Sequence, residues 1–280
     1  MNYRHSFHAG NHADVLKHAI LLRMVTLMQR KEAPLCYLDS HAGTALYDLH
    51  GEDASRTGEY LEGIGRLWSR DDLPELLLAY RDAVARHNTD GLLRLYPGSP
   101  QLVADALREQ DRMILSELHP EDALTLKDHF ADEPRIATHQ RDGYELPKAF
   151  LPVAEKRALW LLDPPFEKSD DLQRCLAAMQ VGIQRMRQTV IALWYPIKDQ
   201  RLLREFYQGI AAAGLPKVLR VELNVRPVDT SLGLNGSGLM LVNPPWPLWE
   251  ELEQTLPWLA AQLAQSGTGG WRMDWLAGQP

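Results

Sequence analysis

The chain has 280 residues but only two cysteines, Cys36 and Cys175, and each lies inside an apolar stretch. So few cysteines argue against a disulfide framework and a cysteine-based zinc site, and they favour a reducing compartment. The sequence also lacks the run of about 18 uncharged apolar residues that a membrane-spanning helix requires. Because the first residues lack the apolar core of a signal peptide, we expect a cytoplasmic protein that does not associate with membranes.

Positive charge is also scarce: 30 Lys and Arg stand against 37 Asp and Glu, and the net charge is −7. This balance argues against a protein that coats nucleic acid without specificity, although it is compatible with a local basic patch. Hydrophobic residues make up 45% of the chain, which is enough for a full core. The sequence does not show the oligomeric state; we expect a monomer without an obligate protein partner.

Seven short apolar runs are typical of buried parallel strands. They lie at 34–39, 112–118, 135–139, 157–163, 189–195, 217–223 and 238–242. Segments 12–30 and 100–110 have helical spacing, and helical spacers separate most of the runs, as in an open α/β sheet with helices on both faces. About 14 residues rich in Gly and Asn join the last two runs, which favours an antiparallel hairpin at the sheet edge. The sequence therefore predicts a doubly wound, seven-stranded, Rossmann-like sheet.

One spacing in this pattern is too long for a single crossover. Asp39 ends the first run and Glu117 ends the second, 117 − 39 = 78 residues later, whereas a crossover needs only about 20–30 residues. The segment 47–95 has helix-like stretches of its own. We therefore expect a Rossmann-like domain formed by residues 1–46 and 96–280, with a small helical insert at 47–95.

Acidic residues follow four successive runs of the predicted sheet, namely Asp39, Glu117, Asp142 and Asp163. The carboxyl ends of parallel strands form the ligand-binding edge of such sheets. An acid after the second strand can accept both ribose hydroxyls, and an acid after the third can accept from an adenine amino group. This fits S-adenosylmethionine better than NAD, because the G-x-G-x-x-G of a pyrophosphate site is missing. The alternative for each acid is a helix N-cap or a solvated loop end.

The sequence D-P-P-F at 163–166 matches the needs of chemistry on an exocyclic amine. Asp163 can accept one N–H and later the proton, while a backbone carbonyl in the turn, that of Pro164, accepts the other. The prolines fix the turn, and Phe166 can stack on a base drawn out of its strand. The alternative is a rigid turn with Phe166 capping the core.

A near-copy, N-P-P-W, occupies 243–246. It follows the last strand, which a hairpin partner holds, and an amide cannot accept a proton near neutral pH. We therefore interpret 243–246 as a structural copy and 163–166 as the functional one.

The segment 2–18 holds four of the ten histidines together with Tyr3, Arg4, Phe7 and Lys17. Rings for stacking and charges for phosphate are what contact with single-stranded RNA needs. His8 and His12 are four residues apart, but the intervening Ala-Gly-Asn favours a loop and no third ligand is evident, so we expect no metal. The alternative is an ordered tail that packs on the sheet.

Six motifs appear in a characteristic order: Y-R-H-S-F-H-A-G-N-H-A-D-V-L-K-H, L-D-S-H-A-G, R-T-G-E-Y-L-E-G-I, Y-P-G-S-P, E-L-H-P and D-P-P-F. In these the chain resembles the RlmJ family of bacterial 23S rRNA adenine-N6 methyltransferases, from Tyr3 through the 243–246 segment. The resemblance implies a class I methyltransferase fold that transfers a methyl group from S-adenosylmethionine to adenine 2030 of 23S rRNA and leaves S-adenosylhomocysteine.

The resemblance also implies roles for single residues. It assigns donor binding to His18, His41, Ser99, Glu117, Asp142, Gly143 and Asp163, and makes Asp163 the catalytic acceptor. It implies that Tyr3 contacts the RNA and that Lys17 lies near the donor, so Tyr3, Lys17 and Phe166 form the expected substrate side. Two departures are Phe166, where a family member has Tyr, and Ser40, where it has Thr; stacking face and hydroxyl, respectively, are kept.

Two other functions share these features. The pattern [DN]-P-P-[FYW] also serves DNA adenine-N6 and protein glutamine-N5 methyltransferases. A non-catalytic RNA-binding protein on the same fold is a third possibility, against which the intact Asp163 and the acidic strand ends speak.

Overall fold

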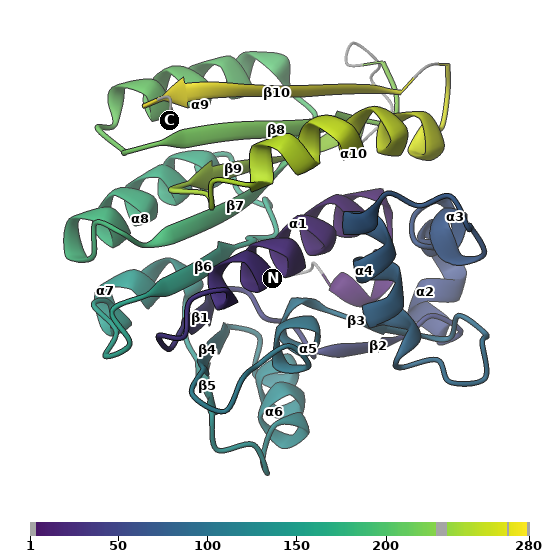
Figure 1. Cartoon of the computed structure of the whole chain (residues 1–280), viewed down its shortest axis with the longest axis horizontal. Coiled ribbons are helices and arrows are strands. Elements are labelled where there is room, and N and C mark those ends of the chain that lie inside the picture. Colours follow the sequence, from purple (N-terminus) through teal and green to yellow (C-terminus); the bar gives the residue numbers. More distant parts are fainter. Residues whose placement is uncertain (1–3, 228–233, 268, 279–280) are drawn as a thin grey trace.

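The computed structural model describes residues 4–227, 234–267 and 269–278. These residues form an eight-stranded mixed sheet with the order β10-β8-β9-β7-β6-β1-β4-β5 (Figure 1). The strands are β1 (Cys36–Asp39), β4 (Arg112–Glu117), β5 (Ile136–Gln140), β6 (Ala158–Leu162), β7 (Val190–Ile197), β8 (Val218–Asn224), β9 (Gly236–Val242) and β10 (Gly270–Ala277). The five from β5 to β7 are parallel, and β9, β8 and β10 add antiparallel pairings.

All seven predicted runs form strands, and the predicted Rossmann-like, doubly wound α/β fold is confirmed. Two details of the prediction were wrong. The sheet has an eighth strand, β10, and the antiparallel β8–β9 pair is not at the edge, because β10 pairs with β8 outside it. The sequence of β10, G-W-R-M-D-W-L-A, mixes polar and apolar residues and is only partly buried, so it lacks the continuous apolar run of the inner strands.

Helices cover both faces of the sheet, because side chains alternate between the faces along each strand. Leu159 and Leu161 of β6 face a core shared with α1 and α10, whereas Trp160 and Leu162 face a second core shared with α7, α8 and α9. The first layer contains α1 (His12–Gln29), α5 (Ser99–Ala104), α6 (Pro120–His129) and α10 (Leu248–Leu263). The second contains α7 (Leu146–Phe150), α8 (Asp171–Arg185) and α9 (Gln200–Ala212) (Figure 1).

The helices predicted at 12–30 and 100–110 are both present, and both lie in the first layer. Helix α1 spans nearly all of 12–30 and begins at Asn11, whose side chain accepts from the backbone N–H groups of Ala13 and Asp14. Helix α5 ends at Ala104, earlier than the predicted 110. Among the described residues, no helix is long and apolar enough to cross a membrane.

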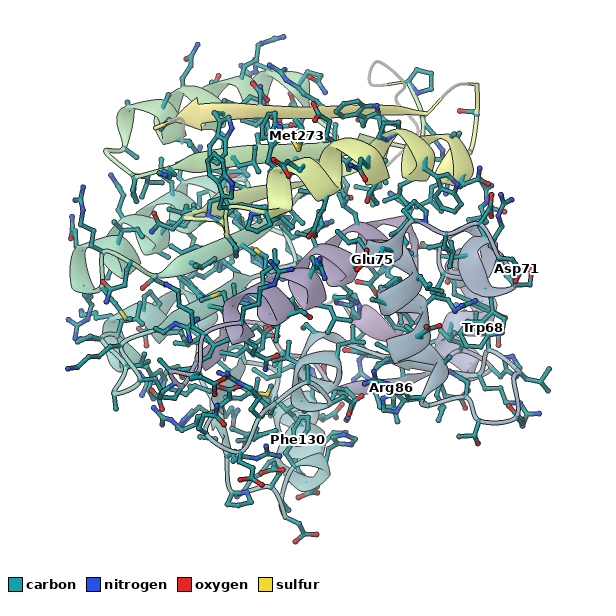
Figure 2. All side chains as sticks on the ribbon, in the orientation of Figure 1. Trp68, Asp71, Glu75, Arg86, Phe130 and Met273 are labelled. Atoms are coloured by element: carbon teal, nitrogen blue, oxygen red, sulfur yellow. The ribbon has the colours of Figure 1, made fainter. Side chains whose placement is uncertain are left out.

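The segment 47–95 is helical, as its sequence predicts, and a small second sheet closes its ends. Strand β2 (Leu46–Asp48) pairs antiparallel with β3 (Leu95–Pro97). Between them lie α2 (Glu52–Thr57), η2 (Glu59–Glu62), α3 (Gly65–Trp68) and α4 (Glu75–Ala85). Figure 2 labels four side chains of this segment: Trp68, Asp71, Glu75 and Arg86. Helix α4 packs against α1 and α10, so the segment adjoins the first helical layer.

Candidate active site

A cavity of about 910 Å³ opens at the carboxyl ends of β1, β4, β6 and β7. It collects most of the residues predicted for donor and substrate, and it is bounded on the other side by the N-terminal segment and residues 57–66. The predicted residues that line it are His18, His41, Ser99, Glu117, Asp163, Lys17 and Phe166. Asp142 and Gly143 lie behind this lining, and Tyr3 falls outside the described residues.

Glu117 ends β4 and is buried at the floor of the cavity. One carboxylate oxygen accepts from the backbone N–H of Gly43 at 2.9 Å, and the other accepts from that of His119 at 2.8 Å. Burial raises the pKa of Glu117, and the two N–H groups oppose the rise. Since each oxygen has a second lone pair, the carboxylate can still accept from two further hydroxyls.

The loop after β1 contacts Glu117 through Gly43, whose left-handed conformation favours glycine. Gly43 has φ +63, and a Cβ there would come within 2.2 Å of the Tyr47 hydroxyl. A side chain at this position would therefore strain the backbone and displace either the loop or the Tyr47 side chain.

Asp39 ends β1 and is fully buried beside this loop. Its Oδ2 accepts from the hydroxyls of Tyr37 and Ser99, each at 2.7 Å. Burial raises the pKa of Asp39 to about 6, although these two hydrogen bonds lower it. Ser99, which is predicted to bind the methyl donor, thus donates its hydroxyl proton to Asp39 and keeps lone pairs that can accept from a ligand in the cavity.

His41 is held neutral on the same loop, because burial lowers its pKa to about 4. Its Nδ1 lies 2.9 Å from the Ser40 hydroxyl. A neutral ring can offer one donor or one acceptor to a ligand without adding positive charge to the site.

Asp142 and Gly143 follow β5 and support the loop that carries His41. Asp142 caps a 3-10 turn by accepting from the Tyr144 N–H at 3.0 Å, and it forms a 3.0 Å ion pair with Arg174. A Cβ on Gly143 would lie 2.0 Å from the carbonyl oxygen of Ser40. The N-cap alternative thus describes Asp142 in part, and its contact with adenine stays a prediction.

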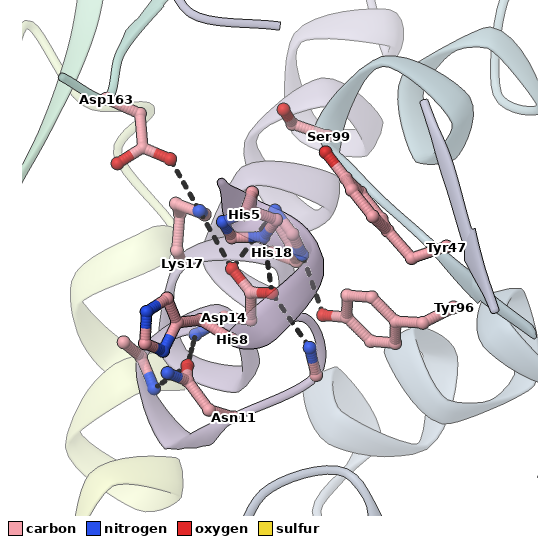
Figure 3. A network of polar contacts seen from close by, with 12 residues as sticks. His5, His8, Asn11, Asp14, Lys17, His18, Tyr47, Tyr96, Ser99 and Asp163 are labelled. Carbon is pink, nitrogen blue, oxygen red and sulfur yellow. Dashed lines mark hydrogen bonds and ion pairs between the residues drawn. The ribbon is translucent and has the colours of Figure 1, made fainter. Parts of the chain in front are cut away.

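Asp163 follows β6 and faces the cavity with its side chain 15% exposed. Its Oδ2 accepts from the ammonium of Lys17 at 2.5 Å, and the same ammonium lies 2.8 Å from Oδ1 of Asp14 (Figure 3). Lys17 is nearly fully buried, so two carboxylates stabilise its charge in place of water. Within residues 4–227, 234–267 and 269–278, Oδ1 of Asp163 has no hydrogen-bond donor, so it can accept from a ligand in the cavity.

The turn after Asp163 is conformationally unusual. Phe166 has φ +51, a left-handed conformation that few residues other than glycine adopt. Its ring stands edge-on to Trp194 of β7, with 5.7 Å between the centroids. Both rings line the cavity next to Asp163 and form an aromatic wall against which a base can pack.

The N-P-P-W copy lies at the amino-terminal ends of the parallel strands, opposite the cavity. Because β9 runs antiparallel to β7, Val242 pairs with Ile191 near the start of β7. The amide of Asn243 donates to the carbonyl groups of Arg187 and Thr189, each at 3.0 Å. These contacts support the interpretation of 243–246 as a structural copy.

The N-terminal segment borders the cavity, which His5, His8 and Asn11 help to line. It forms a 3-10 turn, η1 (His5–Phe7), before α1. His5 lies 2.9 Å from a carboxylate oxygen of Asp14, and His8 lies 3.0 Å from Glu59 (Figure 3 shows both histidines). Among the residues placed in the structure, no group of three or more His, Cys, Asp or Glu could hold a metal ion.

Sequence reasoning missed Asp14, which is the centre of this network. The signal was present in A-D-V-L-K-H: Asp14 stands three residues before Lys17 and four before His18, on one face of a helix. His18 in turn lies 2.7 Å from the hydroxyl of Tyr96, which comes from β3. That contact joins residues 78 positions apart, and no local pattern predicts it.

The chain is similar to known proteins over nearly its whole length. A family model described as "Ribosomal RNA large subunit methyltransferase D, RlmJ" matches residues 32–277. "Ribosomal RNA large subunit methyltransferase J" of Escherichia coli (strain K12) is 42% identical over 276 residues, covering 99% of each chain. The protein of that name from Haemophilus influenzae is 41% identical over 277 residues, again covering 99% of each. A crystal structure of a Legionella pneumophila protein matches with a TM-score of 0.88 at 31% identity, covering 95% of this chain and 98% of that one.

Proposed function

This chain belongs to the RlmJ family of ribosomal RNA large subunit methyltransferases, and on that premise we propose that it methylates the exocyclic N6 of one adenine in 23S rRNA. The methyl donor would be S-adenosylmethionine. The observation that carries the proposal is the position of Asp163, whose partly exposed carboxylate faces the same cavity as Glu117 and the aromatic pair Phe166 and Trp194.

The cavity residues fit the donor. Glu117 has lone pairs left for two ribose hydroxyls, and the close approach of Gly43 keeps the adjoining loop in place. The sulfonium and ammonium groups are positive. Asp163 supplies negative charge at the cavity surface, and the buried Asp39 supplies it from behind the lining residue Ser99. We assign donor binding to His18, His41, Ser99, Glu117, Asp142, Gly143 and Asp163, as the resemblance implies.

When bound, S-adenosylmethionine supplies an electrophilic methyl group on a positively charged sulfur. The protein must then make a poor nucleophile attack it, since the N6 lone pair of adenine is delocalised into the ring. Asp163 accepts one N6–H through Oδ1, and the carbonyl of Pro164 accepts the other, which draws the nitrogen toward tetrahedral geometry. As N6 gains the methyl group, it loses one proton to Asp163.

Lys17 acts on this step through Asp163. Its ammonium holds Oδ2 at 2.5 Å and so fixes the rotation of the carboxylate toward the substrate. Phe166 and Trp194 give the displaced base an apolar surface in place of its neighbours in the RNA stack. Tyr3, Lys17 and Phe166 are the residues that we assign to the substrate side.

We further propose that the protein works as a monomer in the cytoplasm, without a metal, and that segment 47–95 is an insert in a domain formed by 1–46 and 96–280. Helix α4 packs against α1 and α10, which favours an insert that moves with the domain.

The test of the proposed function is transfer of labelled methyl groups. The purified protein should label 23S rRNA from a strain that lacks the corresponding gene, and it should leave DNA and protein fractions unlabelled. Labelling of DNA or of a protein glutamine would transfer the assignment to one of the related methyltransferase classes. Binding of rRNA without any transfer would make the chain a binding protein on this fold.

A further inference from the structure

Asp14 lies at the centre of the polar network between the N-terminal segment and the cavity (Figure 3). Its side chain is 2% exposed. Oδ2 accepts from the Gly10 N–H and lies at hydrogen-bonding distance from His5 Nε2, each at 2.9 Å. Oδ1 lies 2.8 Å from the Lys17 ammonium. The two oxygens of one carboxylate thus bind two different parts of the molecule.

Half of this arrangement is explained by the start of α1. Asn11 caps the helix, and the third helical residue, Asp14, reaches back to the backbone just before the cap, as in a capping box. That role uses Oδ2 and any acid at this position satisfies it. It does not require the contact of Oδ1 with Lys17, nor the continuation from Lys17 to Asp163.

The charges around Lys17 come from few elements. Asp14 on α1 and Asp163 after β6 contact the ammonium directly. His18 on α1 and His5 on η1 reach Asp14, and β7 contributes the ring of Trp194, 5.9 Å from the ammonium. Burial alone would lower the pKa of Lys17, and the two carboxylates raise it well above its usual value.

We propose that Asp14 is a positioning residue that holds the Lys17 ammonium against Asp163 and so keeps the catalytic carboxylate turned toward the substrate. This inference rests on the proposed function, because it assigns Asp163 the catalytic role. It extends the catalytic machinery by one residue that has no direct contact with Asp163 and acts through Lys17 alone.

The role has a signature in the pH dependence of turnover. With Asp14 present, Lys17 stays charged over the accessible alkaline range. Without that carboxylate, Asp163 is the one carboxylate among the described residues that still contacts Lys17, so the pKa of Lys17 falls and the ammonium loses its proton as pH rises. Asp163 then loses its partner, and the rate falls on the alkaline side.

The test compares Asp14→Asn with a matched control, Asp111→Asn. Asp111 is also a buried aspartate that caps backbone and pairs with an arginine, but it precedes β4, at the edge of the sheet away from the cavity. For both variants and the wild type, melting temperature, S-adenosylhomocysteine affinity, and kcat and KM for rRNA are measured from about pH 7 to about pH 10, spanning the usual lysine range.

We expect Asp14→Asn to lose about tenfold or more in kcat relative to Asp111→Asn, with further loss toward alkaline pH and donor affinity near wild type. If Asp14→Asn does not fold, Asp14→Glu replaces it, because Glu keeps the helix cap but moves the carboxylate by one methylene; kcat should again fall about tenfold below the control. Equal kcat and equal pH profiles in the variant and the control would overturn the inference alone. No transfer by the wild type would overturn the proposed function together with it.

Discussion

Replacing Glu117 by glutamine tests the carboxylate that we assign to recognition of the donor ribose. The amide keeps the shape of the side chain and one carbonyl oxygen, so one of the two backbone N–H groups, of Gly43 or His119, keeps its acceptor. The other faces an NH₂ group and loses its bond. The variant also lacks a charged acceptor for a ribose hydroxyl. Such a hydrogen bond contributes about 1.5–3 kcal/mol, so its loss should lower donor affinity about 10- to 150-fold.

The pH dependence of donor binding gives an independent check. An ordinary glutamate has a pKa of about 4.3. Burial raises the pKa of Glu117, so this residue takes up a proton at a higher pH in the free protein. A protonated acid accepts hydroxyl protons poorly. Affinity for S-adenosylhomocysteine should therefore decline in wild type as pH falls through this raised pKa. Glu117→Gln should show a smaller decline, caused by the remaining carboxylates such as Asp39, whose pKa is about 6.

The assay is a calorimetric titration with S-adenosylhomocysteine, with Glu109→Gln as the control. Glu109 is an exposed carboxylate before β4, away from the cavity, and its neutralisation should leave affinity unchanged. If Glu117→Gln bound the product as tightly as this control at every pH, Glu117 would not be a donor ligand, and the placement of the ribose would be wrong.

Three further predictions follow from single contacts. Asn243→Ala removes two hydrogen bonds at the start of β7 and should lower the free energy of unfolding by about 1–3 kcal/mol, measured in urea, while kcat stays near wild type. Burial raises the pKa of Asp39 to about 6, so the folded state binds this proton more tightly than the unfolded state does. The resulting stability is fully present below about pH 4 and is lost as pH rises to about 6. The free energy of unfolding of wild type relative to Asp39→Asn should therefore fall by up to about 3 kcal/mol over that range; an unchanged difference contradicts the burial argument. Gly143→Ala places a methyl group against the Ser40 carbonyl and should lower both melting temperature and donor affinity, whereas Gly91→Ala, which meets no neighbour, should leave donor affinity unchanged.

Much of the fold follows from the sequence because buried parallel strands are encoded as short, continuous apolar runs. All seven such runs form strands, five of them parallel, and two of the predicted strand-end carboxylates, Glu117 and Asp163, line the same cavity. Strand β10 was not predicted, because it is an edge strand whose mixed polar and apolar residues resemble a loop in sequence. The β8–β9 hairpin was predicted at the edge of the sheet, and this was wrong because the unpredicted β10 pairs with β8 outside it.

The site could be predicted only in its local parts. Asp163, Glu117 and the loop at Gly43 are strand ends, and their positions follow from the fold. The links that make the network depend on contacts between distant segments: Lys17 with Asp163 is separated by 146 residues, and Ser99 with Asp39 by 60. Such pairs arise from how α1 and α5 pack on the sheet. The two proline motifs lie at opposite ends of the strands, because β9 runs antiparallel to β7 and Asn243 therefore lies near the start of β7.

The central claim is that Asp163 accepts the proton from N6 of an adenine in 23S rRNA. The most direct measurement is mass spectrometry of 23S rRNA, taken from a strain lacking the gene and incubated with saturating S-adenosylmethionine and either wild type or Asp163→Ala. The account predicts one new N6-methyladenosine with wild type, none with Asp163→Ala, and a variant that is still folded by its melting curve. Methylation by Asp163→Ala at the wild-type rate, or a methyl group on any atom other than N6, would contradict it.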